Sequence, residues 1–464
     1  MKRGAKYNNK SLTISAMLKL FLWLRYLRKK KIVLLSIVAV ALSCSLLIVV
    51  TSLFNSFIDA FEQSAVETMG DVVLTPPVKF ANYPILIEQL EKLSEVEAAT
   101  ATLSAPGLVH LGKGNVRAVT IWGVEPDRRE KVTGFKRFLL KQKNSGAAPS
   151  FVVESSPDKL GGFIGVGVVA EPDEKTDEYN LGEIEKIMGK QAVLTTGAVT
   201  ESWNDEEHDR QFKRKVLPFT ISDIFFTGMY YVDENFVYLP IEQLQKILYP
   251  DERSGITDQI QIKLTDNTQT DAAMAQIRGV WEEFAAEQLG WNSYLISQTD
   301  ISTSRQMQSR YAAELRKQMG VLLFIFGVIS LTAVVLVFCI FYMIVETRQK
   351  DIAVIRSCGA DSGTVALVFV GFGACIGIIG SAVGVSIGYA VTKNINTIEE
   401  WIRLIFGLKL WKSSVYMFSR IPNEVDWAHV LPIAIFAVVA AVVGALIPAI
   451  VAAKTRPVNI LRYE

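Results

Sequence analysis

The hydrophobic residues of this chain gather in four long blocks, separated by polar segments of very different lengths. The blocks contain no Asp, Glu, Lys, Arg or His, and they cover Ile32–Phe54, Val321–Val345, Val365–Thr392 and Leu431–Ala453. An apolar run of about 20 residues is enough for an α-helix to cross a bilayer. The pattern therefore predicts four membrane helices, with bounds at 32–54, 320–345, 365–392 and 431–453.

Helical spacing of apolar residues continues on both sides of the long polar region between the first and second blocks. It is seen at Phe54, Phe57, Ile58, Phe61 and Ala65, and again at Met307, Tyr311, Leu315 and Met319. Apolar residues at i, i+3, i+4 and i+7 are typical of one face of an amphipathic helix. We expect stalk helices at 54–69 and 301–319, which enter and leave a domain that covers 55–319.

Within this domain, strand-like and helix-like patterns alternate. Segments with period-two alternation predict strands at 72–74, 116–122, 191–195, 219–226, 236–239 and 259–264, and a glycine-rich strand at 161–167 that bulges or turns. Helical patterns lie at 85–93, 241–248 and 270–289. The domain contains none of the four cysteines, so it must fold without disulfides. The predicted fold class is an integral membrane protein with four transmembrane α-helices and a large inserted α+β domain.

Local charge predicts the orientation. The net charge of +1 over 464 residues is uninformative, but residues 1–31 carry ten Lys and Arg and no acidic residue. Basic residues beside a first span remain in the cytoplasm. With four spans, the basic N-terminus 1–31, the 346–364 segment and the tail 454–464 are expected to be cytoplasmic. The 55–319 domain and the 393–430 connector are then expected on the outer side of the membrane.

A short charged segment between the second and third blocks is the first candidate functional site. Ile352, Ile355 and Cys358 recur at i, i+3 and i+6, roughly one helical face, and Gly359 is a candidate C-cap. The pattern alone fits two interpretations equally well. The segment is either a helix that enters a groove on a cytoplasmic partner and receives its motion, or an ordinary solvated loop.

Two other features indicate contact surfaces. In the third block the glycines repeat at i+4, which predicts faces for close helix packing, at Gly373, Gly377, Gly380, Gly384 and Gly388. A polar stretch over 197–215 predicts a loop that is either disordered or functional. Its tryptophan slightly favours a partner-docking loop, with candidate residues Trp203, Asn204, Asp205 and Glu206.

The sequence lacks the motifs of several enzyme classes. It has no phosphate-binding loop, no Gly-x-Ser-x-Gly, no His-Glu-x-x-His and no Cys-x-x-Cys, and its three histidines share no metal-ligand spacing. The absence of ionisable residues from the four blocks argues against an ion-coupled carrier. We expect no catalytic residues, cofactor or metal, and any ATP hydrolysis must come from a separate subunit that binds ATP-Mg.

Several motifs resemble permeases of the ABC superfamily, in the group that includes FtsX, MacB and the lipoprotein-releasing pair LolC and LolE. Glu346–Ala360 is similar to the family's coupling-helix motif "ERxxEIAxLRxxGA", and Arg456–Glu464 to its ending "xPxxxLRYE". Leu22–Lys31 resembles the opening "LRYLR-x-K". Ile224–Leu239 and Ser419–Trp427 resemble two motifs of the lipoprotein-releasing permeases, "GIFxxGxYxYDxxxxYV" and "IPVEVDW".

This resemblance implies a fold, a function and partners. The inserted domain would be a MacB-like periplasmic core domain. A cytoplasmic ATPase dimer would grip the coupling helix through Glu346, Arg348, Ile352, Ile355, Arg356 and Gly359. With a second permease, identical or different, the chain would lift lipoproteins from the membrane toward a periplasmic carrier. The segment 197–218 lies where these permeases form a carrier-binding hook, but it lacks their proline-and-glycine pattern. Two alternatives stay open: a MacB-like export permease, and an FtsX-like non-transporting activator of cell-wall hydrolases.

Overall fold

The computed structural model describes residues 31–454 except 113, 154–157, 174, 205–206, 251–254, 348, 358, 360 and 408. The chain divides into two compact units. The first, here the membrane unit, contains the described residues up to 58, residues 314–398 and those from 422 onward. The second, here the α+β unit, contains residues 59–313 and 399–421. Each unit is described by itself.

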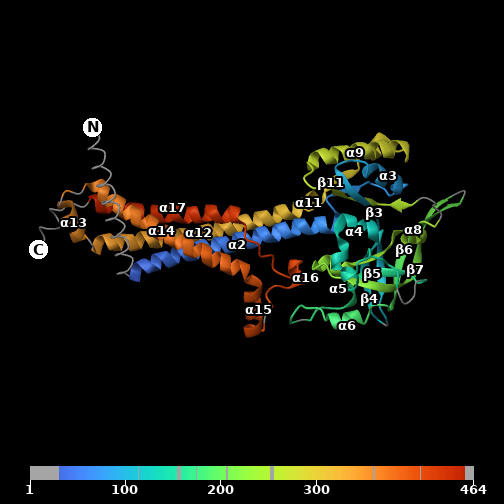
Figure 1. Ribbon diagram of the computed structural model, residues 1–464, viewed down its shortest axis with the longest axis horizontal. Coiled ribbons are helices and arrows are strands. Elements are labelled where there is room, and N and C mark those ends of the chain that lie inside the picture. Colours follow the sequence, from blue (N-terminus) through green and yellow to red (C-terminus); the bar gives the residue numbers. More distant parts are fainter. Residues whose placement is uncertain are drawn as a thin grey trace. The chain divides into compact units, whose positions relative to one another are not determined.

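Four helices in the described part of the chain are long and apolar enough to cross a membrane. They are α2 (Lys31–Met69), α12 (Ser309–Thr347), α14 (Ser362–Lys393) and α17 (Trp427–Lys454), with mean hydropathies of 2.9, 3.0, 2.3 and 2.9 in their most apolar windows. Each contains one of the predicted blocks, and Figure 1 shows the four running alongside one another. Shorter helices of this unit are α13 (Gln349–Ser357) and the start of α15 (Ile395–Phe406).

The membrane unit has a common core to which all four long helices contribute. Its buried residues are Val33 and Val40 of α2, Val337, Ile340, Phe341 and Ile344 of α12, Phe372 and Ile376 of α14, and Ala441 and Ala445 of α17. Small residues of α14 and α17 face each other here, so their backbones approach closely, as is common between membrane helices.

The α+β unit is built on a sheet of nine strands in the order β11-β1-β10-β3-β4-β8-β5-β7-β6. The strands are β1 (Val72–Thr75), β3 (Val96–His110), β4 (Val116–Val124), β5 (Gly161–Gly165), β6 (Gln191–Asn204), β7 (Glu207–Phe225), β8 (Phe236–Pro240), β10 (Gln259–Leu264) and β11 (Asp300–Thr303). A further pairing joins β3 to β6, so the six strands from β3 to β6 in this order close into a ring. Strands β2 (Phe80–Ala81) and β9 (Ile256–Thr257) form a separate pair.

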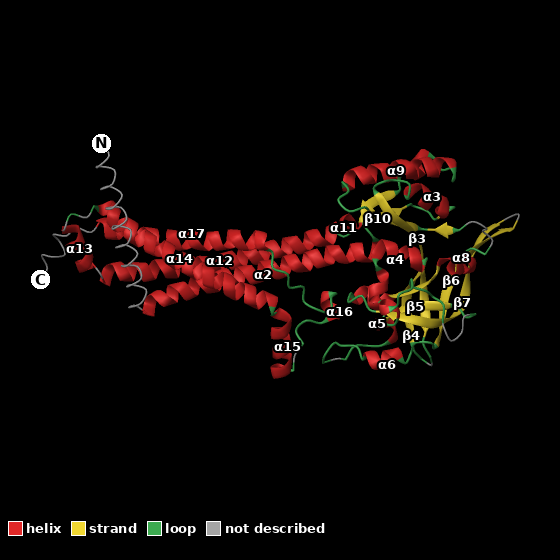
Figure 2. Cartoon of the chain, in the orientation of Figure 1, coloured by secondary structure: helices red, strands yellow, loops and turns green. Residues whose placement is uncertain are grey.

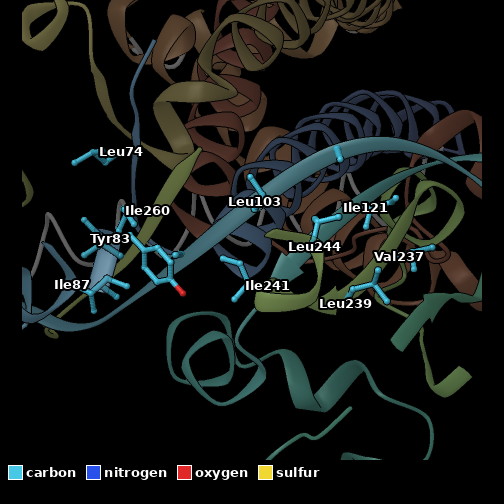
Figure 3. Close-up of a cluster of buried hydrophobic side chains, with 14 of the residues drawn as sticks. Leu74, Tyr83, Ile87, Leu103, Ile121, Val237, Leu239, Ile241, Leu244 and Ile260 are labelled. Carbon is cyan, nitrogen blue, oxygen red and sulfur yellow. The ribbon is translucent and has the colours of Figure 1, made fainter. Parts of the chain in front are cut away.

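Helices cover this sheet and complete its core. They are α3 (Tyr83–Leu90), α4 (Pro126–Thr133), α5 (Val166–Val169), α6 (Leu181–Glu185), α7 (Tyr230–Asn235), α8 (Ile241–Leu248), α9 (Thr270–Glu287), α10 (Ser293–Ser297), α11 (Ser304–Met307) and α16 (Ser413–Tyr416), with 3-10 turns at Phe135–Phe138 and Gln142–Asn144. Figure 3 shows Tyr83 and Ile87 of α3, and Ile241 and Leu244 of α8, among side chains of the strands.

The predicted fold class is confirmed: four long apolar helices, with an α+β domain inserted between the first and the second. The predicted helix over 301–319 is wrong at its start. Residues 300–303 form β11, which pairs with β1, and a capping box at Thr303 and Gln306 begins α11 only at Ser304. The Thr303 side chain accepts a hydrogen bond from the Gln306 amide, which satisfies a donor that a helix N-terminus leaves free.

The predicted loop over 197–215 is also wrong. Strands β6 and β7 stay in register from Gln191↔Thr220 to Asn204↔Glu207, so this stretch is a two-stranded antiparallel ribbon. Figure 2 shows the ribbon extending beyond the rest of the sheet. Apolar alternation is required of a strand only where one of its faces is buried, and pairing between backbones sets no such requirement. The polarity of the ribbon therefore gave no sign of a strand.

Candidate functional site: the charged helix after the second span and the contacts around it

The segment predicted to couple to a partner forms α13, a short helix between α12 and α14. Gly359 follows it with φ +94°, a left-handed conformation that favours glycine, and its amide donates to the Arg356 carbonyl at 3.0 Å. The Asp361 side chain then caps α14 by accepting from the Gly363 amide at 3.0 Å. The chain thus turns sharply between the end of α13 and the start of α14. Arg348 lies outside the described residues.

One face of α13 is buried within the membrane unit. Ile352 is only 4% exposed and clusters with Val345, Val365 and Ala452, and Ala353 is fully buried. Ile352 was predicted to couple to a partner, but its side chain instead fixes α13 to the ends of α12, α14 and α17.

Arg356 also attaches α13 to other helices of the membrane unit, through two hydrogen bonds. Its guanidinium donates to the Ala453 carbonyl at 2.9 Å and to Ser362 Oγ at 3.0 Å. A cation is favourable at the C-terminus of a helix, where backbone carbonyls lack partners within the helix. Arg356 therefore joins α13 to the last turn of α17 and the first turn of α14.

The opposite face of α13 is exposed. Lys350, Val354 and Ser357 lie there at i, i+4 and i+7, and Val354 is 53% exposed although it is apolar. Glu346, also predicted as a coupling residue, is exposed in the last turn of α12. Val354 was missed because the spacing that attracted attention was that of Ile352, Ile355 and Cys358, to which Val354 does not belong. A helical projection of 349–357 places Val354 on the other face.

The five glycines of α14 face two different helices. A Cβ built on Gly373 would lie 2.5 Å from the Cβ of Ala445, and one on Gly377 would lie 3.0 Å from the Cα of Val438, both in α17. A Cβ on Gly380, Gly384 or Gly388 would instead meet α2, at 2.8, 2.8 and 3.0 Å. Through these glycines α14 lies in close contact with α17 at one level and with α2 at another.

In the α+β unit, the chain segments that continue α2 and precede α12 meet at one joint. Gly70, with φ +79°, ends α2, and β1 then pairs with β11 in the register Val72↔Thr303. The Ser304 amide donates to the Asp71 carbonyl at 3.0 Å, and its hydroxyl donates to the Gly70 carbonyl. The two long helices are therefore joined through neighbouring strands.

A buried arginine holds the last turn of α2 at this joint. Arg129 of α4 is 1% exposed, and its guanidinium donates to the Thr68 carbonyl at 3.0 Å and to Gln261 Oε1 at 3.1 Å. Its guanidinium carbon lies 4.9 Å from the ring centroids of both Trp122 and Tyr238. Burial lowers the pKa of Arg129, while Tyr238 acts in the opposite direction. The aromatic faces and the helix carbonyl stabilise this cation.

The connector between α14 and α17 is attached to the same unit at a second place. The Tyr230 amide donates to the Met417 carbonyl at 2.8 Å, and the Ser419 amide donates to the Gly228 carbonyl at 3.1 Å. Nearby, the Ser413 amide donates to Asp177 Oδ2 at 2.7 Å. We call residues 409–419, with these bonds, the clasp.

A buried carboxylate, Asp233, fixes the loop at Thr227 and Gly228 to which the clasp is hydrogen-bonded. Asp233 accepts hydrogen bonds from the Thr227 amide and hydroxyl, both at 2.8 Å, and from the Gly228 amide at 3.0 Å. It is 1% exposed, and burial raises its pKa from 3.8 to about 7 in spite of these bonds. The carboxylate thus holds Thr227 and Gly228 in the conformation that meets the connector.

The predicted partner-docking residues are placed only in part. Trp203 and Asn204 lie at the end of β6, paired with His208 and Glu207 of β7, and Asp205 and Glu206 lie outside the described residues. Among the described residues, no group of three or more His, Cys, Asp or Glu side chains could hold a metal ion.

Four apolar helices, an α+β domain after the first and a docked helix after the second define a membrane subunit of the permease type. The chain belongs to the family of FtsX/MacB-like permeases. Residues 33–280 match the model of the MacB-like periplasmic core domain, and residues 323–457 match the C-terminal model of FtsX-like permeases. Members of this family are non-catalytic transmembrane subunits. The prediction that the chain is not an enzyme is therefore confirmed.

Named relatives share most of the chain at low identity. The lipoprotein-releasing transmembrane protein LolE of Haemophilus influenzae is 24% identical, over 92% of this chain and 93% of the relative. LolC of Neisseria meningitidis is 25% identical, over 96% and 99%. The solved periplasmic region of MacB from Actinobacillus actinomycetemcomitans has 11% identity and a TM-score of 0.31, over 53% of this chain and 95% of that one.

Proposed function

We propose that the chain is a permease subunit of an ABC transporter that extracts lipoproteins from the bacterial inner membrane. A partner ABC ATPase is implied by the family. In this proposal a cytoplasmic ATPase dimer acts on α13, and a second permease, identical or different, completes the complex. Both termini are cytoplasmic, and the α+β unit is periplasmic and delivers the client to a carrier. The likeness to LolC and LolE over nearly the whole chain supports this client class.

The two-sided geometry of α13 is the observation that carries the coupling role. A helix that transmits force must be fixed to its own chain on one side and offer a contact on the other. Ile352 and Arg356 provide the fixed side. Val354, flanked by Lys350 and Ser357, provides an apolar contact on the exposed side. We therefore assign ATPase contact to Val354 and its neighbours, and positioning of the helix to Ile352 and Arg356.

The experiment measures ATP-dependent lipoprotein release from proteoliposomes that contain the chain, its co-purifying ATPase and any second permease, with carrier outside. Val354→Asp places a carboxylate in the contact, and an unpaired buried carboxylate costs several kcal/mol. We therefore expect ATPase binding to weaken by about two orders of magnitude and release to be lost. Thermal stability should not change, because the side chain touches little of its own chain.

Val116→Asp is the matched control, since Val116 is a comparably exposed valine, at 47%, in β4 of the α+β unit. It should leave ATPase binding unchanged. Equal binding by the Val354 and Val116 variants would overturn the coupling assignment. ATP turnover without release in the unaltered complex would instead contradict the lipoprotein client and favour export or hydrolase control.

A further inference from the structure

Helix α15 has one apolar and one polar side. At 100° per residue, its apolar residues fall on one arc and its polar residues on the other, except for Thr397, which lies on the apolar arc. The apolar side carries Ile395, Ile398, Trp401, Ile402, Leu404, Ile405 and Phe406, and the polar side carries Asn396, Glu399, Glu400 and Arg403.

The described residues cover the apolar side only in part: Ile395, Ile398 and Ile402 are half-buried, and the other four residues are exposed. Trp401, Leu404, Ile405 and Phe406 are 65%, 72%, 72% and 68% exposed, and no residue of α15 is buried. The polar side is the more enclosed one at Arg403, whose side chain is 19% exposed and lies 3.4 Å from Glu400. A helix on the surface of a water-soluble protein usually buries its apolar side and exposes its polar side.

The position of α15 along the chain places its start at the membrane boundary. The span α14 ends at Lys393, and α15 begins at Ile395. Tyr389, in the last turns of α14, and Trp427, the first residue of α17, have ring centroids 5.7 Å apart. Tyr and Trp gather at the bilayer–water interface. Ile395 follows Tyr389 by less than two helical turns, so α15 continues directly from a surface that contacts lipid.

We propose that α15 lies in the interface of the leaflet on the side of the α+β unit, with Trp401, Leu404, Ile405 and Phe406 among the upper acyl chains. A helix with Trp, Phe and Leu on one side and charges on the other binds this boundary. Lipid is the occupant we commit to, because α15 directly continues a membrane span. The connector then has one end in the leaflet and the other in the clasp.

The anchor itself does not depend on the proposed function. If the chain does extract lipoproteins, α15 lies in the leaflet that holds the client's acyl chains. It would then fix the connector at the depth from which the client is lifted.

The test uses the full chain in nanodiscs, with its four cysteines replaced by serine and a fluorescent bimane attached to one new cysteine. The lipids are either ordinary or brominated near the top of the acyl chain, because bromine quenches only a fluorophore that touches it. Ile405→Cys reports the apolar side and Glu400→Cys the polar side. Ile435→Cys, on the exposed surface of the span α17, is the positive control.

We expect several-fold stronger quenching at 405 than at 400, close to that at 435. Leu404→Cys should repeat the result at 405, and thermal unfolding of each labelled chain shows that it is folded. Weak quenching at both 404 and 405 would overturn the proposal. In that case, protection of these cysteines from a membrane-impermeant maleimide would point to a protein neighbour, and ready labelling would point to water. If the unaltered complex does not release lipoproteins while quenching at 404 and 405 is strong, the proposed function is contradicted and the anchor is not.

Discussion

The contact between α14 and α2 depends on glycine, and Gly384→Val tests it. A Cβ at this position would lie 2.8 Å from the Ala41 carbonyl oxygen and 2.8 Å from the Cβ of Cys44. The first neighbour is backbone, which cannot move aside as the end of a flexible side chain can. Valine adds two further methyl groups to this Cβ. The two helices must therefore separate or shift along one another.

The matched control is Gly327→Val in α12, because no described atom lies within 4 Å of a Cβ at Gly327. Both variants replace glycine with valine inside an apolar helix, so the change in helix propensity cancels between them. What remains is the cost of overpacking at 384, typically about 1–3 kcal/mol. For a unit of this size, 1 kcal/mol corresponds to about 2–4 °C in the unfolding temperature.

Thermal unfolding of the purified full-length variants in detergent measures this difference. We expect Gly384→Val to melt at a lower temperature than Gly327→Val, by several degrees. The difference between the two variants is the relevant quantity, since any change common to both arises from propensity or from the detergent. Identical melting temperatures would refute close packing of α14 on α2 at this level.

Two other predictions concern the α+β unit. Gly70→Ala should destabilise the chain more than Gly290→Ala, because both glycines have positive φ but only Gly70 has close neighbours, with Ile262 O at 2.9 Å from a built Cβ; equal losses in thermal unfolding would contradict the joint as described. The pKa of Asp233 is about 7 in the folded chain and has its ordinary value of 3.8 in the unfolded chain, so the folded chain binds this proton more tightly. Stability from this group is therefore full below about pH 4 and is lost as pH rises to about 7. Asp233→Asn should flatten the decline in unfolding temperature between pH 5 and 8, and an unchanged pH profile would show that other groups cause it.

Features fixed by local pattern were predicted from the sequence. The four charge-free blocks specify the membrane helices because length and apolarity alone decide that question. Alternation placed β8 and β10 within a residue or two of their observed bounds. The strand predicted at 161–167 corresponds to β5, which has a register shift between Gly162 and Phe163 and ends at Gly165, where α5 follows. Glycines inside a strand commonly mark a bulge of this kind.

Features fixed by distant contacts were missed. Strand β3 consists largely of Ala, Thr and Ser and contains Pro106, so it lacks a strong strand pattern. It is ordered because its first half pairs with β10 and its second half with β4 and β6. The ribbon of β6 and β7 likewise depends on pairing between its strands. Such pairings cannot be deduced from local propensity, which depends strongly on context in strands.

The candidate site shows the same division. The pattern of the charged segment after the second block fitted a helix and a solvated loop equally well, and the resemblance to the coupling-helix motif favoured the helix. Its buried side could not be predicted, because Arg356 is held by Ala453, which lies 97 residues further along the chain. Only once the buried side of α13 is known does Val354 stand out as an apolar residue on the exposed side.

The contacts within each unit, together with one continuous helix, provide a route for force through the chain. Under the proposed function, a displacement of α13 would act on α14 and α17 through Arg356, and α14 contacts α2 through Gly384. Helix α2 then continues without interruption to Met69, where Arg129 holds the Thr68 carbonyl. The steps are one close steric contact, two hydrogen bonds to backbone carbonyls and one to the hydroxyl of Ser362. If α13 receives the motion of an ATPase, as proposed above, this series of contacts is the path along which the chain would pass it on.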